Sequence, residues 1–428
     1  MSSGLINSRR FSKDVLWTLG TRVLMIVNSV AAGIIVAHWL GAKGVGELAV
    51  INVAVTTIVQ LGSFGLPSSN TYFIAQDRAH FPAATINSLL FATAIGSVLA
   101  LALSLLASLR PAWFADVPPN LIRIASVQIP FLLLTLIGLN ILLALGKIRE
   151  FNLLDLVGQS FVLVNALAIL IVAGLGLDAL VKLNTLTSLL VSLVVVVLLF
   201  AGGKKLAESK WRADAALLRR MITYGLKFHV SVLAGAIIFR ADLLVVNHFR
   251  GPAEAGVYSV ATQFGLLLML LPSVIATLLF PRVTAEQDPR GETTWAVTRQ
   301  TALIMLVCCV VAVPGSFLLP LVYGSAFADA TVLLLILLPG VYLIGLESVL
   351  VQHFNAIGLP RAIPLYWATT LVINLVLVFA LVPRFGARGA AIASTLSYAL
   401  IFCLVAFQFR ASTGGSFAEG LARRGLSG

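Results

Sequence analysis

The sequence predicts an all-α integral membrane protein of about twelve transmembrane helices, on three observations. The 428 residues are 59% hydrophobic and only 11% charged, whereas soluble domains carry about 25% charged residues. The mean hydropathy is +1.02. The apolar residues gather in stretches of about 20, the length that a helix needs to cross a hydrocarbon core of about 30 Å. Such a composition cannot cover a soluble domain and leaves little chain for domains outside the membrane.

The first half of the chain contains six apolar stretches. The first one follows the basic start MSSGLINSRRFSKD, is too long for a signal peptide and has no small-residue cleavage site, so we expect a retained helix. The six stretches lie at residues 14–39, 46–74, 84–108, 121–146, 153–175 and 179–201.

Six more apolar stretches follow the basic segment GGKKLAESKWRADAALLRR. They lie at residues 222–248, 254–281, 298–323, 330–356, 362–383 and 388–410. The expected organisation is therefore an N-terminal six-helix lobe, a basic linker, a C-terminal six-helix lobe and a tail, at residues 1–203, 204–221, 222–410 and 411–428.

The Lys and Arg residues predict the orientation. If the N-terminus is cytoplasmic, the inner segments hold about nineteen Lys and Arg and the outer segments about six. Because inner loops carry the excess of positive charge, we expect both termini, the linker and the tail to lie in the cytoplasm.

The formal charge of +12 does not indicate nucleic-acid binding, because the basic residues are scattered over loops and helix ends with no aromatic-interleaved stripe. Cys308, Cys309 and Cys403 all lie inside apolar stretches. Their number and spacing exclude a disulfide framework and a zinc-type motif, and we expect no cofactor.

The two halves of the sequence are related by an internal repeat. A shift of about 210 residues aligns Gly41 with Gly251 and Gly46 with Gly256, and a shift of 212 aligns Gly146 with Gly358 and Gly174 with Gly386. Chance coincidence of glycines in a chain that has 34 of them is the alternative. Because each copy holds six helices, both copies enter the membrane in the same direction, which predicts a pseudo-two-fold axis along the membrane normal.

The segment HWLGAKGVGELAVINVAVTTIVQLGSFGLPSSNTYFIAQ, with its LG-x4-G turn and G-L-P break, and the later turn NAIGLPR resemble the Wzx-type flippases of polysaccharides and O-antigens. That family belongs to the multidrug/oligosaccharidyl-lipid/polysaccharide (MOP) exporter superfamily. The resemblance implies a MATE-like fold in the bacterial inner membrane. It also implies translocation of an oligosaccharide on undecaprenyl diphosphate from the cytoplasmic to the outer leaflet, by alternating access.

Two arginines at membrane depth are candidates for binding the substrate. Arg240 lies about 13 Å inside the outer end of its stretch and Arg22 about 12 Å from the cytoplasmic end of the first. A guanidinium offers bidentate hydrogen bonds to a diphosphate. A structural ion pair is the alternative for Arg240, and snorkelling to the interface is the alternative for Arg22.

Four further residues are candidates for ion coupling. Some lipid flippases of the superfamily hold sodium with an acidic residue, an asparagine and a hydroxyl that Asp242, Asn374 and Thr395 resemble in helix and residue type, although the second carboxylate of that pattern is replaced by Val378. A proton carrier or a buried structural carboxylate is the alternative. Glu347 is the other deep carboxylate, and we expect coupling to Na+ or H+.

The function predicted first is a flippase, a non-enzyme whose partners are a lipid-linked oligosaccharide, membrane lipids and other membrane proteins of polysaccharide assembly. An antiporter of organic cations from the same superfamily is the second candidate, disfavoured by the deep arginines. A membrane polysaccharide polymerase or ligase is a distant third, because the longest outer connection, LRPAWFADVPPN, is short for a catalytic loop.

Overall fold

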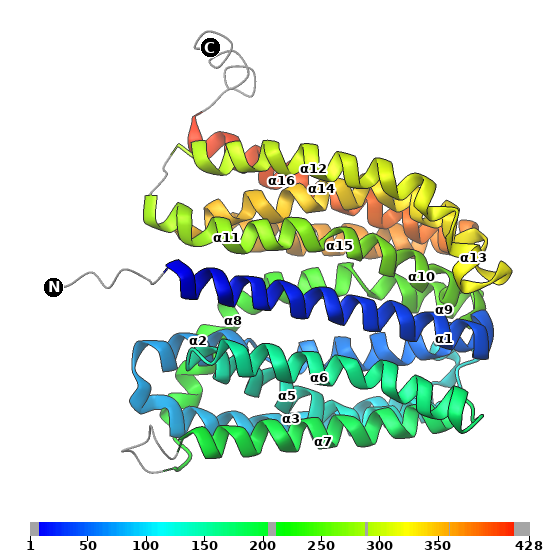
Figure 1. The fold of residues 1–428 in the computed structure, drawn as a ribbon, viewed down its shortest axis with the longest axis horizontal. Helices are drawn as coiled ribbons and strands as arrows, with labels where there is room; N and C mark the ends of the chain where they lie inside the picture. The colour runs from blue at the N-terminus through cyan, green and yellow to red at the C-terminus, as the bar shows by residue number, and fades with distance from the viewer. Residues whose placement is uncertain (1–7, 204–210, 287–289, 359, 415–428) are drawn as a thin grey trace, which may run out of the picture. The chain divides into compact units, whose positions relative to one another are not determined.

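A computed structural model describes residues 8–203, 211–286, 290–358 and 360–414, and these residues are helical almost throughout (Figure 1). The α-helices of the first half are α1 (Ser8–Gly62), α2 (Leu66–Gln76), α3 (Phe81–Leu109), α4 (Pro119–Ser126), α5 (Gln128–Ala144), α6 (Ile148–Ala166), α7 (Leu177–Gly203) and α8 (Ala215–Ile238). Those of the second half are α9 (Ala241–Arg250), α10 (Pro252–Leu268), α11 (Leu270–Glu286), α12 (Glu292–Ser316), α13 (Leu319–Tyr323), α14 (Asp329–Ile357), α15 (Ala362–Phe385) and α16 (Ala387–Thr413). Short 3-10 turns η1 (Arg78–His80), η2 (Pro111–Phe114) and η4 (Ser325–Phe327) and the π-helix η3 (Leu167–Val172) complete the described elements.

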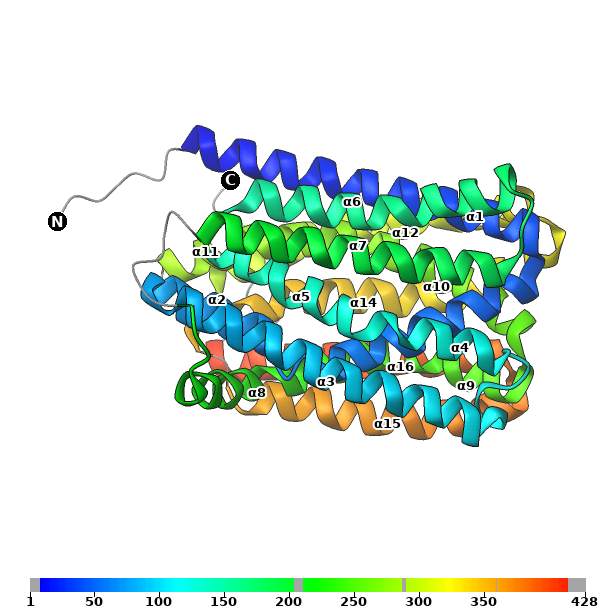
Figure 2. The same cartoon turned by 90° about the horizontal axis from the view of Figure 1, so that it is seen from below.

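Eleven segments of the described chain are long and apolar enough to cross a membrane. The first of them, Trp17–Gly62, has 46 residues, about twice the length that one crossing requires. Gly41 interrupts it with φ 65° and ψ −175°, and the blue chain of α1 reverses direction along its length (Figure 2). Counted as two passes, this segment brings the total to the predicted twelve, and the all-α multi-span prediction is confirmed.

Several predicted stretches are broken inside. The stretch 254–281 is divided at Met269, between α10 and α11. Pro272 follows three residues later, and because proline removes a backbone donor and clashes with the carbonyl four residues earlier, it accounts for the end of α10 at Leu268. The stretch 222–248 is divided at Phe239 and Arg240, between α8 and α9, with no proline nearby to announce the break.

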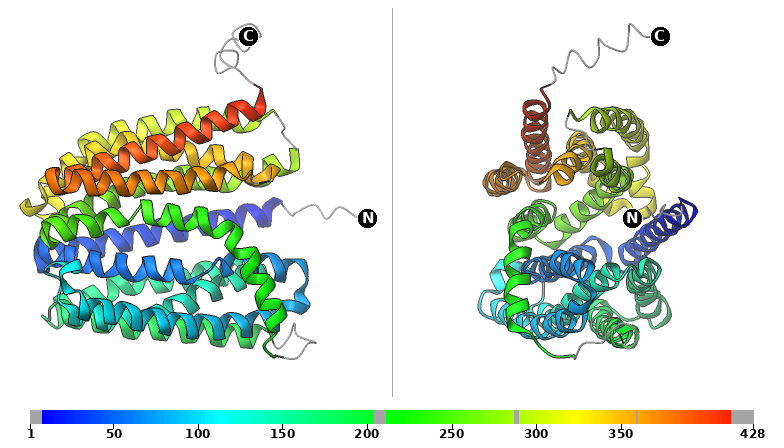
Figure 3. Two further views of the ribbon diagram at one scale, coloured as in Figure 1. Left: turned by 180° about the vertical axis from the view of Figure 1, so that it is seen from behind. Right: turned by 90° about the vertical axis from the view of Figure 1, so that its left-hand side faces the viewer.

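The chain divides into two compact units. The first contains Met1–Ala236 and Gly251–Gly256, and the second Ile237–Arg250 and Val257–Gly428. In the first unit α1 packs against α6 and α3 against α5. The first part of α8 crosses the other helices of this unit at a steep angle (Figure 3). In the second unit α14 is central, and packs against α11, α12 and α16.

The expected linker is partly helical, because α8 begins at Ala215. Asn87 holds the chain just before it: its side chain donates to the Asp214 carbonyl at 2.7 Å and accepts from the Asp214 amide at 3.0 Å. The rest of that linker, 204–210, and most of the expected tail lie outside the described residues. The boundaries expected for the two lobes stay a prediction.

Most of the glycines that define the repeat have a positive backbone φ. Both members of three of the four aligned pairs have a positive φ: 65° and 84° for Gly41 and Gly251, 75° and 100° for Gly146 and Gly358, and 64° and 59° for Gly174 and Gly386. Chance matching of glycines would not reproduce a positive φ at the same three places in both halves, so the repeat is structural.

Two repeat-related turns also touch each other within the first unit. A Cβ placed on Gly46 would lie 1.6 Å from the carbonyl oxygen of Pro252, and a Cβ on Gly256 would lie 2.1 Å from the carbonyl oxygen of Ala42. Because backbone cannot yield as a flexible side chain can, only glycine permits this approach.

Candidate functional site

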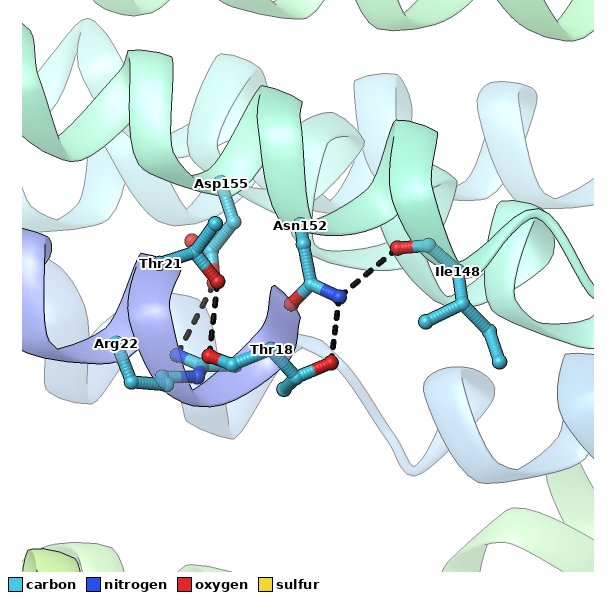
Figure 4. Close-up of polar contacts among 6 residues, drawn as sticks. All are labelled: Thr18, Thr21, Arg22, Ile148, Asn152 and Asp155. Carbon is cyan, nitrogen blue, oxygen red and sulfur yellow. Dashed lines mark hydrogen bonds and ion pairs between the residues drawn. The ribbon is translucent and has the colours of Figure 1, made fainter. Parts of the chain in front are cut away.

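Arg22 forms an ion pair with Asp155 inside the first unit. Its Nη1 lies 3.1 Å from Oδ2 of Asp155, which α6 presents to α1 (Figure 4). The Arg22 side chain is 42% exposed and the Asp155 side chain 21%. The cation therefore has a counter-ion and, because it is partly exposed, still has N–H donors for a further acceptor.

Polar contacts continue along the same two helices, and we call this set the α1–α6 ladder. Asn152 donates from Nδ2 to Thr18 Oγ1 at 2.9 Å and to the Ile148 carbonyl at 2.9 Å (Figure 4). Further along, Asn28 donates to Ser160 at 2.7 Å. The ladder fixes the register of α1 on α6, so the position of Arg22 is determined by more than its own ion pair.

Sequence reasoning missed Asp155. A signal was present, because Asp155 lies in an otherwise apolar stretch three residues after Asn152, on the same helical face, and an ionisable residue within a membrane span is a functional candidate by itself.

Asp242 is the centre of a buried cluster in the second unit and is only 2% exposed. Its Oδ2 accepts hydrogen bonds from the Tyr258 hydroxyl of α10 and from Ser394 Oγ of α16, the latter at 2.8 Å. Its Oδ1 accepts from the Leu243 amide at 2.8 Å. The break before α9 places Asp242 in the first turn of that helix, where unpaired N–H groups and the helix dipole favour a carboxylate.

Asn374, on α15, contacts α16, the helix that carries Ser394. Its Nδ2 donates to Ser397 Oγ at 3.0 Å, and its Oδ1 has no hydrogen-bond partner among the described residues. Ser394 and Ser397 are three residues apart and share a face of α16, so Asp242 and Asn374 are held at neighbouring turns of one helix.

Thr395 does not join this cluster. Its hydroxyl donates to the carbonyl of Ile336 on α14 at 2.7 Å, which is a contact between helices. The hydroxyl donors beside Asp242 come instead from Tyr258 and Ser394. No group of three or more His, Cys, Asp or Glu side chains suited to a metal occurs within the described residues.

Arg240 belongs to the second unit and lies at the break between α8 and α9. Its backbone amide donates to the Ile237 carbonyl at 3.1 Å, and the residue is exposed, whereas Asp242 two positions later is buried. The two therefore lie in different environments, as the spacing of two residues on a helix predicts.

Glu347, on α14, borders a pocket of about 480 Å³ in the second unit. The residue is 3% exposed. The indole N–H of Trp367 donates to its carboxyl group, while Oε1 has no partner among the described residues. The lining of the pocket includes Phe239, Met269, Ser273, Thr277, Ser348, Gln352 and Trp367. This pocket combines aromatic walls with a buried carboxyl group.

Comparison with solved structures supports the predicted fold. The lipid II flippase MurJ, in its inward closed conformation, superposes with a TM-score of 0.74 over 93% of this chain and 87% of MurJ, at 15% identity. An inward-facing multidrug transporter of the MATE family in the MOP superfamily gives 0.71 over 94% and 99%, at 14% identity. The MATE-like architecture is therefore confirmed, at identities that speak for the fold alone.

Sequence comparison identifies the family. The chain is 25% identical over 267 residues to the probable low-salt glycan biosynthesis flippase Agl15 of Haloferax volcanii, which covers 60% of this chain and 54% of that protein. It is 25% identical over 179 residues to the putative O-antigen transporter of Shigella flexneri, covering 41% and 43%. The matches thus span about half the length of these relatives. Residues 12–287 match the family model described as polysaccharide biosynthesis protein, and with this match over more than half of its length the chain belongs to that family.

Proposed function

We propose that this chain is a flippase that moves a lipid-linked oligosaccharide across the cytoplasmic membrane by alternating access. The observation that carries the proposal is the Arg22–Asp155 pair, a partly exposed cation in a segment long and apolar enough to cross a membrane, in a member of the polysaccharide biosynthesis family. Relatives named as a glycan biosynthesis flippase and an O-antigen transporter support it. Their names describe transport, which supports a role without catalysis.

Arg22 would receive the diphosphate of the carrier lipid, undecaprenyl diphosphate. Without substrate, Asp155 neutralises the guanidinium at 3.1 Å, which offsets the cost of a charge in the membrane. With substrate, the diphosphate takes over part of this role through bidentate hydrogen bonds. Arg240, exposed at the break between α8 and α9, is proposed as a second, separate cation that binds substrate.

Ion coupling is proposed for the cluster around Asp242 and Asn374. The carboxyl group of Asp242 and the unpartnered Oδ1 of Asn374 supply the oxygen chemistry that Na+ requires, and a carboxyl group can also carry H+. Thr395 and Glu347 have other surroundings, so our proposal for coupling rests on the first two residues.

The proposed setting is the inner membrane of a bacterium, with both termini in the cytoplasm. The excess of Lys and Arg in alternate connections supports this orientation. Other membrane proteins of polysaccharide assembly are proposed as partners, since a translocated oligosaccharide must be received at the outer leaflet.

The test is translocation in proteoliposomes of a lectin-detectable oligosaccharide on undecaprenyl diphosphate. We expect Arg22→Ala and Arg240→Ala to lower the initial rate at least tenfold, because a hydrogen bond to a charged group contributes about 1.5–3 kcal/mol. Arg388→Ala is the matched control: Arg388 also pairs with an aspartate, Asp329 at 3.3 Å, but both side chains are more than half exposed, so its rate should stay near wild type.

Two results would count against the flippase. One is a wild-type protein that moves no lipid but exports an organic cation, which would favour the antiporter. The other is a rate that falls equally in all three arginine variants, which would indicate a general effect of charge instead of a site.

A further inference from the structure

We propose that the pocket around Glu347 binds one sugar residue of the lipid-linked oligosaccharide, and that Glu347 determines specificity by accepting hydrogen bonds from the hydroxyl groups of that sugar. The inference rests on the proposed function and adds a substrate-binding site to it. The pocket belongs wholly to the second unit.

Glu347 can accept more hydrogen bonds than the described chain gives it. The residue is 3% exposed, Trp367 donates to one part of its carboxyl group, and Oε1 has no partner within the described chain. Buried polar atoms are normally hydrogen-bonded, and leaving an acceptor unpaired costs stability. A donor from outside the chain would complete this site.

Asp242, another buried carboxyl group of this unit, differs from Glu347 in this respect. Both Asp242 oxygens are occupied, by Tyr258 and Ser394 on one and by the Leu243 amide on the other. The protein itself donates hydrogen bonds to both oxygens of Asp242, whereas Glu347 borders a pocket and can accept further hydrogen bonds.

The walls of the pocket combine hydroxyl groups with aromatic rings. Ser273, Thr277 and Ser348 donate their hydroxyl hydrogens to carbonyls of their own helices, at 2.7, 2.8 and 2.8 Å, so their oxygens remain as acceptors. Trp367 and Phe239 add aromatic surface. A sugar matches both features, because it has many hydroxyl donors around a ring with apolar C–H faces.

The position of the carboxyl group is fixed before a ligand arrives. Trp367 on α15 holds it from one side, and Ile344, which lines the same pocket, is packed in the hydrophobic core of the unit. A site built to bond a hydroxyl rejects an analogue that lacks it far more strongly than an apolar pocket rejects a missing methylene. Glu347 therefore suits discrimination between sugars.

The experiment measures binding of the detergent-solubilised full chain to bare undecaprenyl diphosphate and to the same lipid carrying one N-acetylglucosamine, galactose or rhamnose residue. For wild type we expect at least one glycosylated lipid to bind about tenfold more tightly than the bare lipid. In Glu347→Gln, which keeps the size of the side chain and places an NH₂ donor where an acceptor stood, this ratio should fall to about one.

Two further variants separate the site from general effects. Asp329→Asn changes an exposed carboxylate on the same helix α14 and should keep the wild-type ratio. Trp367→Phe retains an aromatic ring and removes the donor to Glu347, so it should lower the ratio partly, which keeps the proposal testable if Glu347→Gln does not fold.

The outcomes are distinguishable. A wild-type ratio near one for all three sugars, or a ratio that survives Glu347→Gln, overturns the sugar site while leaving the flippase intact. Failure of wild type to bind any of the four lipids overturns the proposed function itself. Binding of rhodamine 6G that is lost in Glu347→Gln, with a lipid ratio of one, would reassign the pocket to an organic cation.

Discussion

At the level of single residues, the carboxyl groups of Asp155, Asp242 and Glu347, each in a helix long and apolar enough to cross a membrane, have three different surroundings. Asp155 has a cation beside it, Asp242 has only neutral donors, and Glu347 has one donor and a pocket. The free-energy cost of burying a carboxyl group depends on what surrounds it. A carboxyl group can therefore stabilise a helix pair, stabilise the start of a helix or keep an oxygen open to a ligand.

Asp242 allows a prediction that separates structure from coupling. Asp242→Ala leaves the donors of Tyr258, Ser394 and Leu243 unpaired, and each unpaired buried group costs about 1–3 kcal/mol, so we expect a clear loss of thermal stability in detergent. Asp242→Asn should recover most of it, because the amide oxygen can accept from Leu243 and the two hydroxyls can accept from the NH₂ group.

Transport by Asp242→Asn then decides the role of this residue. A folded variant that loses dependence on an ion gradient would support coupling. A folded variant that transports like wild type would make Asp242 a structural residue, and equal stability of Asp242→Ala and wild type would contradict the hydrogen-bonded cluster.

Position inside an apolar stretch selects Asp242 and Glu347, and the resemblance to sodium-binding lipid flippases selects Asn374, but neither identifies their hydrogen-bond partners. Asp242 finds Ser394 across a separation of 152 residues, and hydropathy does not say which way a side chain points around its helix. The resemblance points to Thr395, whereas the hydroxyl of α16 that contacts Asp242 is that of Ser394, because adjacent positions on a helix point in different directions.

Helices were predictable as elements, since apolar stretches of spanning length leave few alternatives. Every predicted stretch is helical, but the breaks inside them divide into two kinds. The end of α10 is explained by Pro272, which the sequence displays. The break between α8 and α9 has no such residue, and it depends on the hydrogen bonds that the new helix end at Asp242 makes with distant residues.

The backbone conformation of Gly41, inside α1, predicts how a substitution there changes stability. Its φ of 65° and ψ of −175° lie in a region essentially confined to glycine, so Gly41→Ala should destabilise the protein by about 1–3 kcal/mol. Gly20 is the matched control, because it lies inside α1 and a Cβ at either glycine would meet no atom within 4 Å.

Gly20→Ala should be neutral or stabilising by up to about 1 kcal/mol, since alanine is the better helix former. Apparent melting temperatures of the two variants provide the measurement. Equal shifts would mean that backbone conformation at Gly41 is not what limits substitution there.

At the scale of the whole molecule, the sequence predicts the orientation of the chain in the membrane. The distribution of Lys and Arg predicts that the connection 110–118 is outside and that residues after 203 are inside. Green fluorescent protein fused after residue 203 should therefore fluoresce, and alkaline phosphatase fused after residue 116 should be active. The reverse pattern at both sites would invert the topology and move Arg22 to the opposite half of the membrane.

The close approach at Gly46 has a consequence for the history of the chain. Under the shift of 210 residues, Ala42 corresponds to Pro252 and Gly46 to Gly256, and the contact is reciprocal: 46 meets 252 and 256 meets 42. Reciprocity of this kind defines the isologous interface of a two-fold homodimer. Gene duplication and fusion of an ancestral dimer accounts for it, so a half-length relative, where one exists, should keep this glycine at its subunit boundary.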